Sequence, residues 1–308
     1  MMPVLQPERT SPPQPANSNY RLRMQPTQSS LYVQSLGAGI AVLRAFDANR
    51  PAMNLPEIAA ASGVTRSTAQ RLAFTLQALG LLKKDAKTKR YSLAPDVLDM
   101  ACHYLEAHPL VDRANAVLLE LNRETGETVN LAEPAGLDMM YICRFPSPMR
   151  LLVHMPLGRR IPMFCSSSGR TWLSGLPDSE IAATLERSEL TKFTEHTITD
   201  RSLLMKEIHR VRDNRFACCI NEYYQGDLAL AVPVYGRSGR MEAALQLSVP
   251  SSKWEAEQAI KHFVPKMQAA ASLMQRAAPS ADYRATHSSA APGPKDQVAA
   301  PPGTAPEL

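Results

Sequence analysis

The most constraining feature of the sequence is a pair of short helical segments separated by one glycine-containing turn. The first segment, residues 54–62, has a proline and an acidic residue in its first turn, where both residue types favour a helix. Gly63 can adopt the left-handed conformation that ends a helix, and Thr65 can cap the next one. The second segment, residues 66–79, carries its apolar residues on one face. Two helices joined in this way predict a helix-turn-helix.

The segments around this pair predict the rest of a small domain. A helix over residues 36–46, capped by Ser35, is expected before it. After it, the basic run 83–90 lies between apolar residues, and Tyr91 begins a second apolar segment. This pattern predicts a β-hairpin with a basic tip, although a solvated lysine loop is the alternative. The sequence therefore predicts a winged helix-turn-helix that binds DNA over residues 31–94.

The second helix of the pair carries the side chains expected to read DNA, because a recognition helix places its N-terminal residues at base edges in the major groove. Arg pairs bidentately with guanine and Gln with adenine, whereas hydroxyls and wing cations more often hold phosphates. Thr68 can also be a helix-internal residue without DNA contact. The expected contact residues are Arg66, Ser67, Thr68, Gln70 and Arg71 in the helix and Lys87, Lys89 and Arg90 in the wing.

The formal charge of +5 is unevenly distributed along the chain. Residues 31–105 have nine basic and five acidic side chains, whereas residues 106–308 have 22 basic and 23 acidic ones. A basic front half suits a polyanionic partner, and a near-neutral back half indicates a different task.

The two ends of the chain have a biased composition. Residues 1–30 and 279–308 each contain six prolines and lack a periodic apolar pattern. Such segments cannot bury enough apolar surface to offset the entropy of ordering, so both are predicted to be disordered tails. No apolar run reaches the ~20 residues of a membrane helix, and the start does not resemble a signal peptide. We therefore expect a cytoplasmic protein without a membrane partner.

The back half mixes helices with strand pairs. Residues 95–123 predict linker helices, and the amphipathic part from residue 109 onward is expected to connect the two halves mechanically. Segments 129–144 and 228–249 each contain two apolar runs around a turn cluster, which predicts two hairpins. A terminal helix is expected over residues 254–275. The sequence thus predicts an α+β domain over residues 124–278.

A cluster of three serines is the feature of this domain that most resembles a nucleophilic site. Ser166, Ser167 and Ser168 precede Gly169, at the start of a predicted helix. Serine nucleophiles need a base that is oriented by a third group, and no such partner can be assigned here. Hydroxyls and free N–H groups at a helix N-terminus also attract carboxylates, and simple helix capping is the remaining interpretation. Known hydrolase, zinc-protease and P-loop motifs are missing from the sequence, so we expect no catalytic residues.

The cysteines do not suggest a metal site. Their number is odd, at five, and no CxxC pair occurs, so free thiols are expected. Cys102 and His103 with His108 come nearest to a zinc-ligand pattern, but their spacing does not fit one. The sequence predicts neither a metal nor a cofactor.

Several blocks together resemble the isocitrate-lyase-regulator (IclR) family of transcription factors. The resemblance covers roughly residues 31–275, and the blocks follow the family's order. The blocks are residues 62–72 (Ser-Gly-Val-Thr-Arg-Ser-Thr-Ala-Gln-Arg-Leu), 79–82, 90–93, 125–131, 157–162, 197–200, 222–226 and 231–234. The resemblance implies an N-terminal winged helix-turn-helix, a linker helix and a C-terminal GAF/profilin-like domain that binds an effector.

The resemblance also implies where the effector lies. In the family, the stretch aligned with residues 164–171 lines the pocket, and its backbone N–H groups hold the carboxylate of a small organic acid. Cys219 replaces a frequent Asp, Ala229 a frequent Cys and Gln246 a frequent Ser, so the ligand is expected to differ from that of better-known members. An aromatic or larger acid is one option that the sequence leaves open. The implied effector residues are Val153, Ser167, Ser168, Cys219, Ala229, Gln246 and Ser248.

These features lead to one functional hypothesis and two alternatives. The hypothesis is a ligand-responsive regulator that binds a palindromic operator as a dimer or tetramer, senses a small organic acid and controls a catabolic operon. The first alternative is an enzyme with an appended DNA-binding domain that acts on a small organic acid. The second is a winged helix that serves as a protein-interaction module.

Overall fold

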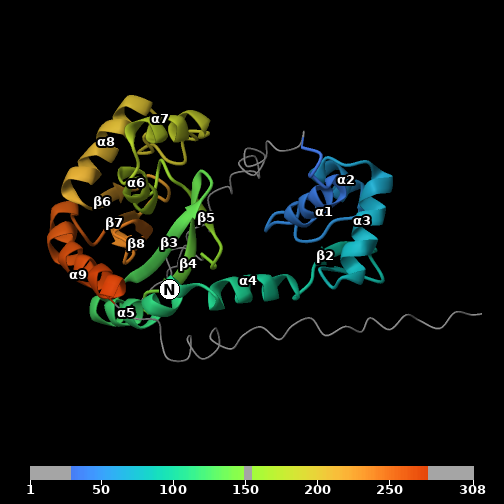
Figure 1. Ribbon diagram of the computed structural model, residues 1–308, viewed down its shortest axis with the longest axis horizontal. Helices are drawn as coiled ribbons and strands as arrows, with labels where there is room; N and C mark the ends of the chain where they lie inside the picture. Colours follow the sequence, from blue (N-terminus) through green and yellow to red (C-terminus); the bar gives the residue numbers. More distant parts are fainter. Residues whose placement is uncertain (1–28, 149–154, 277–308) are drawn as a thin grey trace, which may run out of the picture.

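The computed structural model describes residues 29–148 and 155–276. The predicted disordered tails lie outside the described residues, apart from positions 29 and 30. The described chain forms an N-terminal domain and a larger C-terminal domain, with one helix running between them (Figure 1).

The N-terminal domain is a winged helix-turn-helix, as predicted. Its three helices share an apolar core in which Val42, Ile58 and Ala69 are fully buried. The two strands pair as an antiparallel hairpin and form the wing. The elements are α1 (Gln34–Arg44), α2 (Leu55–Ser62), α3 (Arg66–Ala78), β1 (Leu82–Lys84) and β2 (Tyr91–Leu93).

The start of α1 differs from the prediction. Val33, not Ser35, occupies the N-cap position, and no side chain caps the helix. The N–H of Gly37 donates to the Val33 carbonyl at 3.1 Å, so helical hydrogen bonding begins earlier than expected. Ser35 therefore lies inside the first turn, where its hydroxyl is not needed as a cap.

Two helices follow the wing. The first, α4 (Val97–Glu106), spans the gap between the domains and has no buried residue (Figure 1). The second, α5 (Pro109–Thr125), begins at a proline and packs its apolar face into the C-terminal domain. The bridging element is thus α4, whereas the sequence pattern predicted that the segment forming α5 connects the two halves.

The C-terminal domain is built on a six-stranded antiparallel sheet with the strand order β5-β4-β3-β8-β7-β6. Both predicted hairpins are present, as β3–β4 and β7–β8. The strands are β3 (Thr128–Ala135), β4 (Asp138–Phe145), β5 (Arg160–Pro162), β6 (Ala217–Ile220), β7 (Asp227–Tyr235) and β8 (Met241–Pro250).

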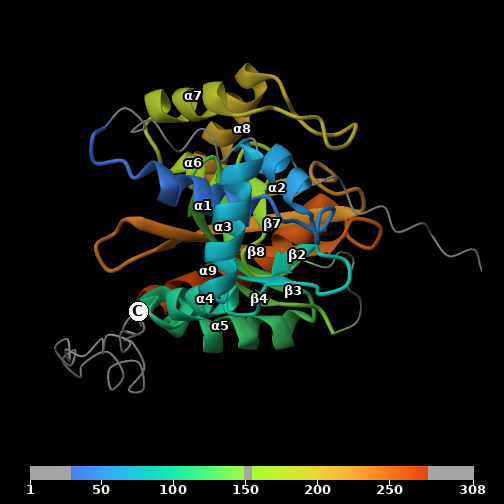
Figure 2. The same cartoon turned by 90° about the vertical axis from the view of Figure 1, so that its right-hand side faces the viewer.

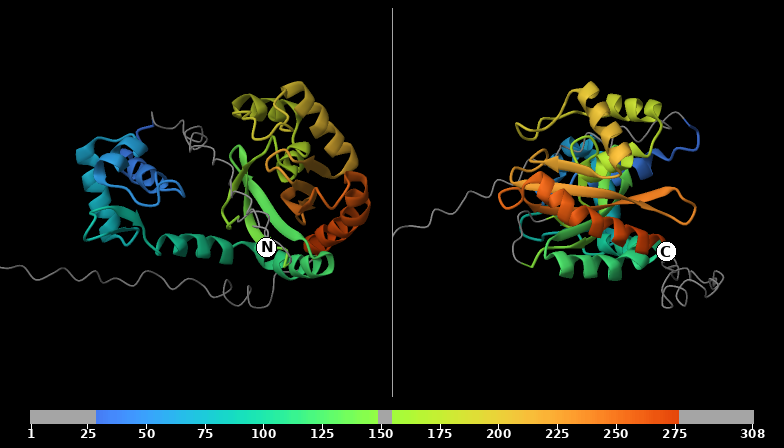
Figure 3. Two further views of the ribbon diagram at one scale, coloured as in Figure 1. Left: turned by 180° about the vertical axis from the view of Figure 1, so that it is seen from behind. Right: turned by 90° about the vertical axis from the view of Figure 1, so that its left-hand side faces the viewer.

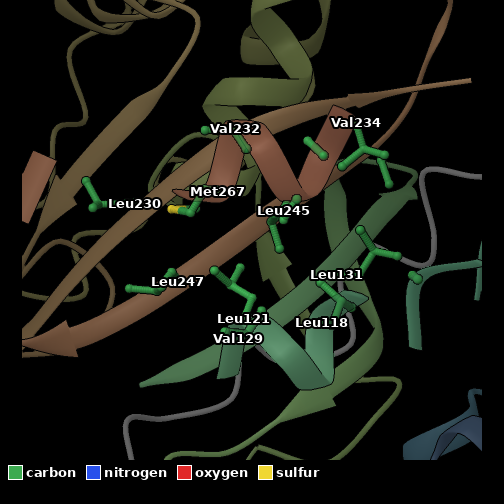
Figure 4. Packing of buried hydrophobic residues seen from close by; sticks show 14 of the residues in the cluster. Leu118, Leu121, Val129, Leu131, Leu230, Val232, Val234, Leu245, Leu247 and Met267 are labelled. Carbon is green, nitrogen blue, oxygen red and sulfur yellow. The ribbon is translucent and has the colours of Figure 1, made fainter. Parts of the chain in front are cut away.

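Helices cover the two faces of this sheet. Figure 3 shows α5 and α9 (Ala256–Arg276) along one face and the α7–α8 layer on the other. On the first face, leucine, valine and methionine side chains from α5, α9 and the strands interlock (Figure 4). Each such fully buried side chain contributes about 1.5–3 kcal/mol to stability. The other face is covered by α6 (Ser167–Ser174), α7 (Asp178–Arg187) and α8 (Arg201–Asn214).

Helix α6 lies unusually close to the chain segment that precedes it. A methyl group on Gly169 would come within 2.3 Å of the Met163 backbone, a distance that side chains do not tolerate. At Gly175, the other end of α6, a methyl group would meet first the terminal carbon of Met241 at 2.8 Å, and that side chain is flexible.

We therefore expect G169A to destabilise the C-terminal domain by about 1–3 kcal/mol, the usual cost of overpacking. G175A is the matched control, and its effect is expected to stay below about 1 kcal/mol because Met241 can move aside. Denaturant unfolding of both full-length variants measures the difference. Equal stabilities for the two variants would contradict the close approach at Gly169.

Candidate functional site

The turn of the helix-turn-helix is set by local hydrogen bonds. Gly63 has φ of 72°, the left-handed conformation predicted for it. The hydroxyl of Thr65 caps α3 by accepting from the Thr68 N–H at 3.3 Å. At the start of α2, Asn54 and Glu57 form a reciprocal capping box. These contacts fix where α3 begins and hence which of its residues project outward.

The outer face of α3 carries most of the side chains predicted to contact DNA. Arg66, Ser67, Gln70 and Arg71 are exposed, and α3 lies on the side of its domain away from the C-terminal sheet (Figure 2). Thr68 is half-buried, and its hydroxyl lies 2.9 Å from that of Thr65. Thr68 therefore takes part in the cap at the start of α3.

Two of the three wing cations predicted to contact DNA are exposed to solvent. Lys87 and Lys89 are exposed at the hairpin tip, where the Asp85 carboxylate accepts from the Lys87 N–H at 3.0 Å. Arg90 is half-buried instead. Its guanidinium donates to the Ala52 carbonyl at 2.8 Å and to the Glu57 carboxylate at 2.7 Å. Arg90 thus attaches the wing to α2, a role that the sequence did not reveal.

One side chain on α3 was missed by the sequence analysis. Phe74 is 72% exposed and follows Gln70 by one helical turn. An aromatic ring on the outward face adds apolar surface beside the polar contact residues. The 3–4 residue spacing along the helix was the signal that could have found it.

The sheet of the C-terminal domain has two chemically different faces. Successive strand residues point to opposite faces, so Val129 and Leu131 on β3 face α5 and α9. Asn130 lies between them and faces the opposite side, as does Gln246 on β8. This second face, near one end of the sheet, borders two connected chambers.

The inner chamber lies between the sheet and α6. The outer chamber adjoins it, since both are lined by Met155, Tyr224 and Asp227. The cavity volume is about 20 Å³ in the inner chamber and about 80 Å³ in the outer one. Both chambers are therefore narrower in this conformation than typical sites for small molecules, which have volumes of ~300–1,000 Å³.

The inner chamber ends at the N-terminus of α6. Ser166 caps this helix, with its hydroxyl accepting from the Gly169 N–H at 3.2 Å. Ser167 and Ser168 follow it and are completely buried, and among the described residues neither side-chain oxygen has a hydrogen-bond partner. Buried hydroxyls are normally paired. The orphaned oxygen of Ser167, which lines the chamber, is thus available to a ligand beside the positive end of a helix dipole.

The structure brings together most of the residues predicted to bind the effector. Ser167, Cys219, Ala229 and Gln246 line the inner chamber, and Ser248 lines the outer one. Ser168 is buried next to them, but it is not among the residues that line either chamber. Val153 lies outside the described residues.

A row of polar side chains crosses three strands and was not predicted. The register places Asn130 between Arg144 on β4 and Gln246 on β8. Arg144 donates to the Asn130 side-chain oxygen at 2.9 Å, and the Tyr141 hydroxyl donates to the Gln246 side-chain oxygen. A bulge opposite Leu131 lets both Tyr141 and Arg144 face the chambers, although simple alternation would separate them.

A buried ion pair between Arg170 and Glu222 lies beside the inner chamber. Arg170 on α6 is 2% exposed and donates through both terminal nitrogens to Glu222, at 2.6 and 2.5 Å. Its Nε donates to the Phe164 carbonyl at 2.9 Å. Glu222 also accepts from the Ile198 N–H at 3.3 Å. The pair therefore connects α6 with the segments before α8 and after β6.

The thiols near the chambers are unreactive. All five cysteines are free, and only Cys102 is exposed. Burial raises the pKa of Cys143 to about 12 and, as the main cause, that of Cys218 to about 11. Burial also raises the pKa of Cys165 and of Cys219 well above the usual value. These groups stay protonated at neutral pH, and two of them, Cys165 and Cys219, line the inner chamber as small apolar side chains.

The described part of the chain contains no group of three His, Cys, Asp or Glu side chains placed to hold a metal ion. Among its helices, none combines the length and apolar character needed to cross a lipid bilayer.

Two family profiles match the chain over most of its described length. Residues 35–86 match the IclR helix-turn-helix domain, and residues 102–276 match the C-terminal domain of the bacterial transcriptional regulator IclR. The chain belongs to the IclR family of transcriptional regulators. It combines the helix-turn-helix domain of this family with its C-terminal effector-binding domain.

Named relatives agree with this assignment. The chain is 31% identical over 240 residues to the Pca regulon regulatory protein of Pseudomonas putida, covering 78% of this chain and 82% of that one. It is 28% identical over 239 residues to the p-hydroxybenzoate hydroxylase transcriptional activator of Acinetobacter baylyi, covering 76% and 88%. A solved structure of a putative transcriptional regulator from Rhodococcus sp. RHA1 is 33% identical, with a TM-score of 0.70 and coverage of 80% and 98%. Relatives of this kind are regulators and not enzymes.

Asp227 has an unusual titration for a carboxyl group. Burial raises its pKa to about 7, although a hydrogen bond with Ser248 and the charge of Arg144 act in the opposite direction. An unfolded aspartate has a pKa of about 3.9. Between these two values the folded chain retains a proton that the unfolded chain has lost, so stability falls as the pH rises through this window.

We expect D227N to remove this pH dependence because an amide cannot ionise. The melting temperature of the variant relative to wild type is expected to rise between pH 5 and pH 8. D178N is the control: hydrogen bonds from Arg212 and His209 hold the pKa of the exposed Asp178 below its usual value, so this carboxylate stays ionised from pH 5 to pH 8 and D178N is expected to change the melting temperature by a small, constant amount over that range. Thermal melting across the pH range measures both, and a pH-independent difference for D227N would contradict the raised pKa.

Proposed function

We propose that the chain is a ligand-responsive transcriptional regulator that binds a pseudo-palindromic operator as a dimer or tetramer. It senses a small organic acid and controls a catabolic operon in the cytoplasm. The observation that carries the proposal is the presence, in one chain, of an outward-facing recognition helix and of a chamber bordered by a helix N-terminus with an orphaned hydroxyl. The first feature suits DNA, and the second suits a carboxylate.

DNA binding is supported by the side chains on α3 and the wing. Arg66, Gln70 and Arg71 have the donor geometry for base edges in the major groove. Lys87 and Lys89 extend from the same domain and suit phosphate contacts. Arg90 is committed to α2, so it supports the wing's position more than it contacts phosphate.

Self-association is supported by apolar surface on two helices. Leu36 on α1 is 66% exposed, and Leu98 and Met100 on α4 are 67% and 62% exposed. Within the described part of the chain, helix α4 has no buried residue, so apolar side chains such as these are available to a partner. A second copy of the chain is the partner that a palindromic operator requires, because its two half-sites need two recognition helices.

The chemistry of the chambers favours an aromatic acid as the effector. The α6 N-terminus and Ser167 suit a carboxylate, and Tyr141, Tyr223 and Tyr224 supply aromatic walls. Two relatives are named for the Pca regulon and for p-hydroxybenzoate hydroxylase. The second name itself contains an aromatic acid, which agrees with the chemistry of the walls.

Substitutions on α3 and in the wing are expected to weaken DNA binding in different ways. K89A removes one phosphate contact and reduces the slope of log K against log salt by about one. R71A loses a base contact and lowers specific affinity by about 1–3 kcal/mol. K206A changes the same charge on α8 and serves as the control. Mobility shifts on DNA upstream of the protein's own gene measure all three, and an equal loss for K206A would refute a specific wing contact.

An aromatic acid is expected to stabilise the full-length chain. At 100 times its dissociation constant, a ligand adds about 2.7 kcal/mol to the free energy of unfolding. Thermal shift with 4-hydroxybenzoate, 3-hydroxybenzoate and benzoate tests the proposal, with phenol as the probe that lacks a carboxylate. S167A is expected to weaken acid binding about 5- to 10-fold through one lost hydrogen bond, whereas S174A, on the same helix, leaves it unchanged. Stabilisation by phenol as strong as that by the acids would argue against the α6 carboxylate site.

A further inference from the structure

The linker helix α4 makes few contacts that fix its direction. None of its residues is buried, and Leu105, near its end, is only partly buried against the C-terminal core. The N-terminal domain is attached at its other end (Figure 1). Any contact between α4 and the effector domain therefore has a large influence on where the recognition helix points.

Such a contact forms at the corner between α4 and α5. The Tyr104 hydroxyl donates to one carboxylate oxygen of Glu133 on β3, and the His108 Nε2 lies 3.1 Å from the other. The Tyr104 and His108 rings meet edge to face, with their centroids 5.4 Å apart. One carboxylate thus holds side chains from α4 and from the residue that precedes α5.

The charge state of Glu133 suits this role. Burial alone would raise its pKa, but hydrogen bonds from His108 and Tyr104 outweigh it and hold the pKa below its usual value. The carboxylate is therefore ionised at neutral pH and accepts both bonds. The His108 Nδ1 is buried and has no hydrogen-bond partner among the described residues. The imidazole is thus held on the Glu133 side only.

Strand β3 connects this corner to the chambers. Asn130, which lines the outer chamber, lies on one face of the strand, and Glu133 lies on the other face, three residues later. Three residues of strand span about 10 Å. A shift of β3 caused by a ligand at Asn130 would thus move the group that holds α4.

We propose that Glu133 is a positioning residue that sets the direction of α4 and connects the effector chambers to the DNA-binding domain. The proposal rests on the proposed function for its regulatory meaning, but the position of α4 can be tested without DNA or effector. Two other ion pairs attach α5 to its surroundings, Arg113 with Glu242 and Lys266 with Glu124, and neither includes a residue of α4. They provide matched controls.

The test compares hydrogen exchange in the full-length chain for wild type, E133Q, Y104F and the double variant. Loss of a hydrogen bond to a charged group is expected to speed exchange in residues 97–106 about tenfold. The double variant is expected to show no more than the larger single effect, because both changes break one contact. E124Q neutralises the carboxylate that pairs with Lys266 and is expected to leave these rates unchanged. Y104F alters an exposed ring and keeps the test valid even where E133Q impairs folding.

A second measurement separates positioning from a purely structural role. E133Q is expected to change affinity for DNA upstream of the protein's own gene at least threefold, with the same salt slope as wild type, because the recognition helix itself is intact. A fall in melting temperature with unchanged exchange in residues 97–106 would overturn the proposal, as would additive effects in the double variant. A wild-type chain that binds no DNA would refute the proposed function alone, since the exchange rates then decide the positioning role.

Discussion

The effector-binding half depends on one buried interaction, the ion pair between Arg170 and Glu222. Arg170 fixes α6 against the Phe164 carbonyl, and Glu222 holds the Ile198 N–H, so three segments distant in sequence are held in one place. Breaking such a pair by removing one partner typically costs ~3–5 kcal/mol, because the remaining charge is buried without compensation. The pair holds α6 against the segment that follows β6 and so helps to position the helix whose N-terminus borders the inner chamber.

The second constraint is the two-faced sheet. Alternation directs Val129 and Leu131 into the apolar layer with α5 and α9, and it directs Asn130 toward the chambers. A one-residue slip in register would exchange the faces and bury Asn130 among leucines, so the apolar layer itself enforces the polar row. The polar lining of the chambers and the stability of the domain are therefore set by the same strand register.

The sequence was most informative where function depends on local structure. The helix-turn-helix followed from Gly63 and Thr65, whose roles are set within a few residues. The Arg144–Asn130–Gln246 row was missed because it joins three strands across a bulge, and periodicity within one strand does not show its neighbours. The bonds of Arg90 were missed for a similar reason, since its partners Ala52 and Glu57 lie more than 30 residues away. Contacts between residues that are distant in the sequence cannot be predicted from a local sequence pattern.

The coupling between ligand and DNA has to come from a difference in free energy between two arrangements of the chain. Regulators of this type need about 1–3 kcal/mol, which changes operator affinity roughly 5- to 150-fold. Hydrogen bonds to a charged group contribute about 1.5–3 kcal/mol each, so a single carboxylate such as Glu133 is sufficient in magnitude. Within one chain α4 has no buried residue, so the corner at Glu133 is one of the few contacts that can set its direction. The proposed control of a whole domain by a contact of a few kcal/mol depends on this weak packing within the chain.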